Sequence, residues 1–146
     1  MSERNYPAHP VVSVGAVILD GERVVLVKRG HAPLKGEWSL PGGVVELGET
    51  LEAAVAREAL EETGLAVEVG DVVEVLDRVL RSADGRVEFH YVIIDYRCRA
   101  FDDRLAGGSD AEEVRWVEIA DLPAYQVTDA VSAVVHKALG LAEPMP

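Results

Sequence analysis

Hydrophobic and polar positions along the chain predict a mostly β protein. Segments rich in β-branched and aromatic residues suit strands, and these are expected at 11–19, 24–28, 65–80, 87–100 and 113–119. The Asp20-Gly21 pair between the first two segments predicts a hairpin, and the Ala-Asp-Gly sequence at 83–85 predicts a second turn. A loop rich in glycine and proline is expected from Gly30 to Gly43.

Two helices of different character are expected. Residues 50–63 have a helix-forming composition, with Thr50 as the N-cap and Gly64 in position to end the helix in a left-handed conformation. Beyond the Asp-Leu-Pro break at 121–123, apolar residues recur at helical spacing, which predicts an amphipathic C-terminal helix that packs on the sheet. This stripe consists of Val131, Val134, Val135, Ala138 and Leu139.

Three glutamates crowd one part of the first helix. At about 100° per residue, Glu58, Glu61 and Glu62 fall within an arc of about 100°. The opposite side holds Ala53, Ala56 and Leu60. We therefore expect the helix to pack by its alanine and leucine side and to present the carboxylates on the other.

The carboxylate cluster has two interpretations. A run of this kind is most often a solvated acidic face, but such a face usually has lysines one turn away. Here the flanking residues are instead Leu51, Ala54, Val55 and Ala59. Like charges at this spacing repel one another, whereas hard divalent cations such as Mg²⁺ bind through carboxylate oxygens and remove that penalty. The cluster therefore favours a metal site.

Length and composition indicate a single domain. The chain has 146 residues, of which 49% are hydrophobic and 27% charged, as expected of a globular protein with one core. We expect one domain over residues 1–146, with its core at about 11–140. Cys98 is the only cysteine, which excludes an intramolecular disulfide and fits a reducing, cytoplasmic environment.

The formal net charge of −12 argues against nucleic-acid binding, which depends on lysine and arginine. The apolar run 11–19 is too short to cross a bilayer and lacks a cleavage site, so neither a membrane segment nor a signal peptide is expected. If the substrate is an anion, a local feature must overcome the negative field of the chain.

Fixed spacing around the helix identifies a motif. Five residues separate Gly43 from Glu49, seven more precede Arg57-Glu58, and Glu61-Glu62 are followed by Thr63, Gly64 and Leu65. This pattern resembles the Nudix box, Gly-x5-Glu-x7-Arg-Glu-U-x-Glu-Glu-x-Gly-U, where U is a bulky aliphatic residue. Every fixed position matches, and the one departure is Ala59, which is smaller than the usual aliphatic residue.

The resemblance implies an α/β fold, an α/β/α sandwich around a mixed β-sheet, and hydrolysis of a nucleoside diphosphate linked to another moiety with Mg²⁺ or Mn²⁺. By position in the box, the metal ligands would be Glu58, Glu61 and Glu62, with the Gly43 carbonyl as a further candidate. Arg57 would hold Glu49 and fix the preceding loop against the helix.

Further candidate residues lie outside the box. The resemblance implies a general base from another segment, and residues 109–116 offer Asp110, Glu112 and Glu113. Adjacent residues of an extended segment point in opposite directions, so only one of the two glutamates is expected to reach the site, and we favour Glu112. Lys28 and Arg29 are candidates for phosphate binding.

Trp38 has two interpretations as well. It lies just before the Pro-Gly-Gly sequence at 41–43, where an aromatic ring could stack on a nucleobase, or it packs in the core.

The wider sequence, over about residues 11–130, resembles small bacterial Nudix hydrolases described as ADP-ribose pyrophosphatases. The leading hypothesis is therefore hydrolysis of ADP-ribose or a related nucleotide sugar to a nucleoside monophosphate and a phosphorylated remainder. One alternative is cleansing of oxidised nucleoside triphosphates. Another is a noncatalytic module that binds a nucleotide sugar. The resemblance also allows a homodimer.

Overall fold

The computed structural model describes residues 5–30, 36–106 and 111–142, except for the side chains of residues 111, 112 and 142. The described residues form a seven-stranded sheet. Its strands are β1 (Val11–Asp20), β2 (Arg23–Arg29), β3 (Trp38–Ser39), β4 (Gly42–Val44), β5 (Val67–Arg81), β6 (Val87–Ala100) and β7 (Ala111–Glu118). The other elements are α1 (Leu51–Thr63), the 3-10 segment η1 (Ile119–Tyr125) and α2 (Asp129–Ala142).

The sheet is mixed. Its strand order is β3-β2-β1-β6-β5, with β4 paired to β1 and β7 paired to β2. β1 runs parallel to β6, with Gly15 opposite Asp95, whereas its pairings with β2 and β4 are antiparallel. The predicted hairpin of β1 and β2 is confirmed, with Asp20 opposite Arg23.

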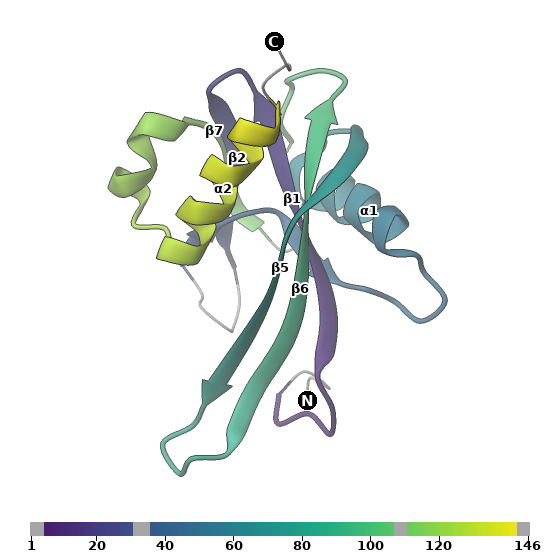
Figure 1. Cartoon of the computed structure of the whole chain (residues 1–146), viewed down its shortest axis with the longest axis vertical. Coiled ribbons are helices and arrows are strands. Elements are labelled where there is room, and N and C mark those ends of the chain that lie inside the picture. The colour runs from purple at the N-terminus through teal and green to yellow at the C-terminus, as the bar shows by residue number, and fades with distance from the viewer. Residues whose placement is uncertain (1–4, 31–35, 107–110, 143–146) are drawn as a thin grey trace.

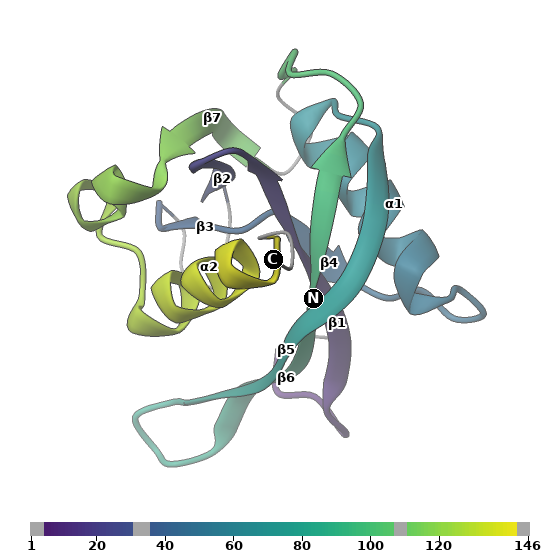
Figure 2. The same cartoon turned by 45° about the horizontal axis from the view of Figure 1, so that its top comes forward.

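The two helices cover opposite faces of the sheet (Figures 1 and 2). Alternate residues of a strand point to opposite faces, and β1 accordingly contributes to two separate cores. Val14, Ala16 and Ile18 pack with α1, whereas Val17 packs with β2 and α2. The α/β class and the α/β/α sandwich expected from the sequence are confirmed.

The ends of α1 are as predicted. The Thr50 side chain accepts a hydrogen bond from the Ala53 amide at 3.2 Å, and Gly64 ends the helix with φ 76°. This positive φ suits glycine, which has no Cβ to clash with the backbone.

The predicted packing side of α1 is wrong. Ala53 is exposed and Leu60 is 55% exposed. The buried side carries Ala54, Val55 and Ala59 together with two of the glutamates, Glu58 and Glu62. The Glu58 carboxylate can face the sheet because Gly43 of β4 has no side chain, and the Glu62 carboxylate accepts a hydrogen bond from the Gly42 amide.

The loop expected from Gly30 to Gly43 is also only partly correct. Residues 31–35 lie outside the described residues, but Trp38–Ser39 and Gly42–Val44 form the short strands β3 and β4. A Cβ on Gly42 would overlap the carbonyl oxygen of Val14. Glycine therefore serves here to bring β4 close against β1 rather than to form a turn.

The apolar stripe of α2 packs on the sheet as expected. Val134, Val135 and Ala138 are fully buried against Val17 and Leu26. Within the described residues, the helices are too short or too polar to cross a membrane.

Candidate functional site

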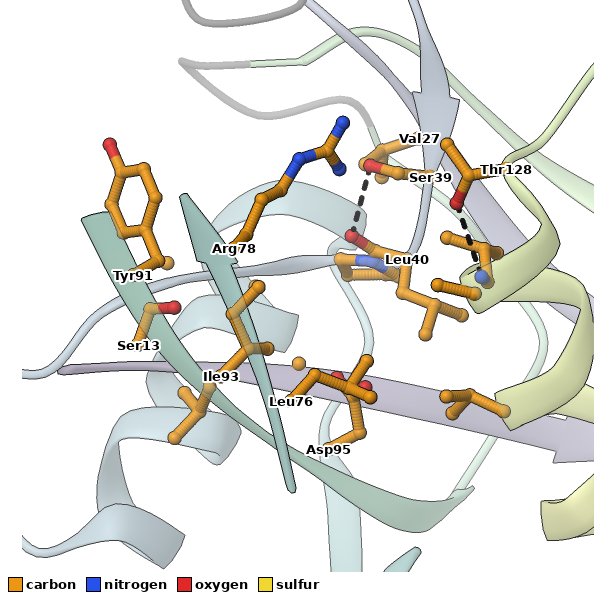
Figure 3. A pocket seen from close by; sticks show the side chains of 18 of the residues that line it. Ser13, Val27, Ser39, Leu40, Leu76, Arg78, Tyr91, Ile93, Asp95 and Thr128 are labelled. Atoms are coloured by element: carbon orange, nitrogen blue, oxygen red, sulfur yellow. Dashed lines mark hydrogen bonds between the residues drawn. The ribbon is translucent and has the colours of Figure 1, made fainter. Parts of the chain in front are cut away.

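A cavity of about 550 Å³ opens beside the middle of the sheet (Figure 3). Its wall is assembled from segments far apart in the sequence. They include Gly15 of β1, Gly42 and Gly43 of β4, Glu58 and Glu62 of α1, Asp95 of β6, and Thr128 and Asp129 at the start of α2. The volume lies within the usual range of small-molecule sites, roughly 300–1,000 Å³.

Arg57 ties the loop before α1 to the helix. Its Nε and Nη2 donate to the two carboxylate oxygens of Glu49 at 2.6 and 2.9 Å, and Nη2 also donates to the Val44 carbonyl at 3.1 Å. Nη1 donates to Glu58 at 2.9 Å and to Glu61 at 3.4 Å. One guanidinium thus fixes the loop and orients a carboxylate at the cavity wall, because its planar set of donors can serve several acceptors at once.

The protonation states follow from these contacts. The Arg57 guanidinium, helped by the Glu46 amide, lowers the pKa of Glu49 to about 2. The hydrogen bonds to Glu49 raise the pKa of Arg57 above its usual value, despite the opposing effect of burial. The pair therefore stays charged at neutral pH and holds the loop in one position.

Glu58 and Glu62 are 9% and 8% exposed, whereas the Glu61 side chain is 51% exposed. The Gly42 amide donates to Glu62 at 3.3 Å, and a Cβ on Gly43 would collide with the Glu58 carboxylate. Gly43 therefore leaves the space that the Glu58 carboxylate occupies, and the Gly42 amide holds the Glu62 carboxylate.

The donor set suits a hard divalent cation. Carboxylate and carbonyl oxygens are what Mg²⁺ and Mn²⁺ prefer, and Glu58, Glu62 and Gly43 share one stretch of the cavity wall. In the described part of the chain, no group of three or more His, Cys, Asp or Glu side chains is already arranged to hold a metal ion. Glu61 instead contacts Arg57, so a three-glutamate ligand set would require its exposed side chain to turn.

The motif residues and this geometry agree with comparisons to known proteins. The family model described as NUDIX domain matches residues 9–137. The chain belongs to the NUDIX family.

Similar proteins carry several activities in their names. An ADP-ribose pyrophosphatase of Methanocaldococcus jannaschii is 38% identical over 115 residues, which cover 79% of this chain and 66% of that protein. A putative 8-oxo-dGTP diphosphatase of Bacillus subtilis is 31% identical over 111 residues, or 76% of this chain and 68% of that protein. The crystal structure of a MutT NUDIX hydrolase from Burkholderia pseudomallei superposes with a TM-score of 0.75 at 34% identity, covering 88% of this chain and 98% of that one.

Of the predicted substrate-binding residues in this NUDIX domain, Arg29 lines the cavity and Lys28 does not. Lys28 lies opposite Trp38 and Glu113 in the neighbouring strands. Trp38 is not a lining residue either. Its ring packs edge-on against Tyr125, with 5.2 Å between the ring centres, and belongs to the core on the α2 side.

The candidate general bases are only partly described. Asp110 and the side chain of Glu112 lie outside the described residues. Glu113 forms an ion pair with Arg115 at 2.8 Å and does not line the cavity. Glu112 as the base therefore stays a prediction.

Arg78 of β5 and Asp95 of β6 are among the charged lining residues that were not predicted from the sequence. Arg78 lies 4.0 Å from Glu37 and extends over the cavity (Figure 3). Asp95 follows the apolar run Val92, Ile93 and Ile94. A charged residue within such a central strand is a sequence signal that could have drawn attention to it.

Proposed function

We propose that this NUDIX domain hydrolyses the pyrophosphate bond of a nucleoside diphosphate derivative, with ADP-ribose or a related nucleotide sugar as the substrate. The observation that carries the proposal is the position of Glu58 and Glu62. Both are largely buried on α1, and both reach the cavity wall beside Gly43. Carboxylates at a nucleotide-sized cavity are what metal-assisted phosphate chemistry requires.

In this proposal Glu58, Glu61 and Glu62 hold Mg²⁺ or Mn²⁺ with the Gly43 carbonyl as a further ligand. When bound, such an ion neutralises charge on the pyrophosphate and lowers the pKa of the attacking water. Arg57 and Glu49 act indirectly, since their contacts fix Glu58 and the loop. Arg29 and Arg78, which line the same cavity, supply positive charge for the phosphates.

The reaction itself balances simply. The oxygen of water forms a bond to one phosphorus, and the bond from that phosphorus to the bridging oxygen breaks. The bridging oxygen leaves with the other phosphate, so the products are a nucleoside monophosphate and a phosphorylated remainder. A general base removes the proton from water, and Glu112 is our candidate ahead of Glu113 and Asp110.

ADP-ribose is favoured by the similarity to the Methanocaldococcus jannaschii pyrophosphatase, the more similar of the two curated relatives described above. The similarity to the Bacillus subtilis protein supports a second candidate, the cleansing of oxidised nucleoside triphosphates to a monophosphate and pyrophosphate. The two differ in a measurable way, because only the second releases inorganic pyrophosphate.

A substrate panel tests the proposal. The protein is incubated with Mg²⁺ and ADP-ribose, other nucleotide sugars, NADH, dinucleoside polyphosphates or 8-oxo-dGTP, and products are identified by mass spectrometry. We expect AMP and ribose 5-phosphate from ADP-ribose. Release of pyrophosphate from 8-oxo-dGTP as the main activity would favour the second candidate. Binding without turnover of any compound would favour a noncatalytic module.

Glutamine variants test the metal site. Glu58→Gln and Glu62→Gln should each lower the turnover rate by about a hundredfold or more and weaken Mn²⁺ binding measured by calorimetry. Glu52→Gln is the matched control, because Glu52 lies on the same helix but is exposed and does not line the cavity. Retained Mn²⁺ affinity in the Glu62→Gln variant would remove Glu62 from the ligand set.

A further inference from the structure

Asp95 is the most deeply buried carboxylate at the cavity. It is 4% exposed and comes from the centre of β6, directly opposite Gly15 of β1. A Cβ on Gly15 would collide with the Asp95 carboxylate. The glycine therefore leaves the space in which this side chain lies, and the carboxylate is part of the cavity wall (Figure 3).

This carboxylate has no partner among the described residues. No hydrogen bond or ion pair from the described part of the protein reaches it. Burial, with a smaller contribution from the charge of Glu74, raises the pKa of the Asp95 carboxyl to about 6. A buried carboxylate without a partner destabilises a fold, so its presence in a ligand-sized cavity calls for a partner from the ligand.

The surroundings of Asp95 indicate which part of a ligand would reach it. Leu76 and Ile93 lie next to it (Figure 3), and Val134 also lines the cavity. Arg78 lies on the opposite side of the cavity (Figure 3). Apolar side chains next to a hydrogen-bond acceptor suit a nucleobase, whose faces are apolar and whose edge carries hydrogen-bond donors, whereas the negative charge of Asp95 would repel a phosphate.

We infer that Asp95 is a specificity residue, which accepts a hydrogen bond from the amino group of a nucleobase held between the apolar side chains beside it. This inference rests on the proposed function, since it assigns the nucleoside end of the substrate to this part of the cavity. A ribose hydroxyl is the other N–H or O–H donor that a nucleotide offers, and the experiment separates the two.

The test uses nucleoside monophosphates, which are products and are not turned over. Binding to the Mg²⁺-loaded protein is measured by calorimetry for AMP, purine riboside 5′-monophosphate, which lacks only the amino group, and 2′-deoxy-AMP. GMP and IMP form a second pair that differs only in an amino group. If Asp95 accepts a hydrogen bond from the amino group, then in one of the two pairs the nucleotide with the amino group should bind at least about tenfold more tightly than the nucleotide without it.

Variants assign this preference to Asp95. In the Asp95→Ala variant, the ratio of the two affinities in the discriminated pair should fall to about one. The Asp71→Asn variant, which changes an exposed residue on β5, should keep the ratio of the unchanged protein. The Asp95→Asn variant should melt at or above the temperature of the unchanged protein, because it removes an unpaired buried charge. Mn²⁺ affinity should be the same in all of these proteins.

Each other outcome overturns the inference. Equal affinity within both pairs, or a ratio that Asp95→Ala leaves unchanged, would remove Asp95 from base recognition and leave the proposed function intact. A selective loss of 2′-deoxy-AMP binding would assign Asp95 to the ribose. Weakened Mn²⁺ binding in Asp95→Asn would make it a metal ligand. Absence of binding by every nucleotide would refute the inference, and together with no turnover of the substrate panel it would refute the proposed function as well.

Discussion

Replacing Asp95 by asparagine should stabilise the protein at neutral pH and have little effect in acid. Asparagine has nearly the shape of a protonated aspartic acid, so the variant mimics the neutral form of the native side chain. The side chain is 4% exposed, and burial raises its pKa from 3.8 to about 6. The difference between the two proteins therefore measures the free energy of holding this carboxylate charged in the folded state.

The sign and the pH window follow from the two pKa values. Below the unfolded value of 3.8, the group is protonated in both states and contributes no difference. As the pH rises toward 6, the unfolded chain loses the proton while the folded chain keeps it, and the free energy of unfolding falls. The rise of the Asp95 pKa from 3.8 to about 6 lowers the free energy of unfolding by roughly 3 kcal/mol, and the full effect is present above pH 6.

Urea unfolding of both proteins between pH 4 and pH 8, without nucleotide, is the measurement. We expect the free energy of unfolding of the variant to exceed that of the unchanged protein by little at pH 4 and by up to about 3 kcal/mol at pH 7. For a chain of this size, the difference at pH 7 raises the melting temperature by about 6–12 °C. Asp71→Asn is the control, because an exposed substitution of the same kind should change stability by less than about 0.5 kcal/mol at either pH.

If the free energies of unfolding of Asp95→Asn and the unchanged protein differ by the same amount at pH 4 and at pH 8, this reasoning is refuted. A loss of stability in Asp95→Asn at pH 7 would refute it more directly, because that result requires a partner that stabilises the charged carboxylate in the folded protein.

Three further predictions concern the motif. Arg57→Lys should lower the melting temperature in a thermal shift assay, because an ammonium cannot reproduce the donors that bind Glu49, Glu58 and the Val44 carbonyl; an unchanged value would contradict this. Gly43→Ala should reduce the turnover rate at least about tenfold, because the added Cβ collides with the Glu58 carboxylate. As a control, Gly140→Ala places its Cβ in open space on α2 and should raise the free energy of unfolding by about 0.5–1 kcal/mol. Glu49 has a pKa of about 2 in the folded protein, so its stabilising effect is present above its unfolded pKa of 4.5 and is lost as the pH falls toward 2. The melting temperatures of Glu49→Gln and the unchanged protein should therefore converge in acid.

The regular elements were predictable because each depends on local pattern. β-branched runs between turns predicted the long strands, and Thr50 and Gly64 predicted both ends of α1. The spacing from Gly43 to Leu65 predicted the family, since this motif is defined within one contiguous segment. The contact between Arg57 and Glu49 implied by that resemblance is present in the structure.

The errors arise where tertiary contacts decide the outcome. Placing the charged residues of α1 toward solvent gives the wrong packing side, because Gly43 leaves space for the Glu58 carboxylate against the sheet and the Gly42 amide binds Glu62. The local pattern places both glycines at the end of a loop, because glycine usually breaks regular structure. Asp95 was missed because the cavity brings together strands and helices that no local pattern relates.

Two kinds of carboxylate at this site have opposite effects on stability. Glu49 and Glu58 are hydrogen-bonded to Arg57, so their contacts exist before any ligand arrives and support both the fold and the site. Asp95 has no such contact within the described residues, and its burial destabilises the folded state. Substitution in the first group should therefore lower stability and activity together. Substitution of Asp95 should raise stability while it reduces discrimination among nucleotides, and this opposite pairing is what separates a recognition residue from a structural one.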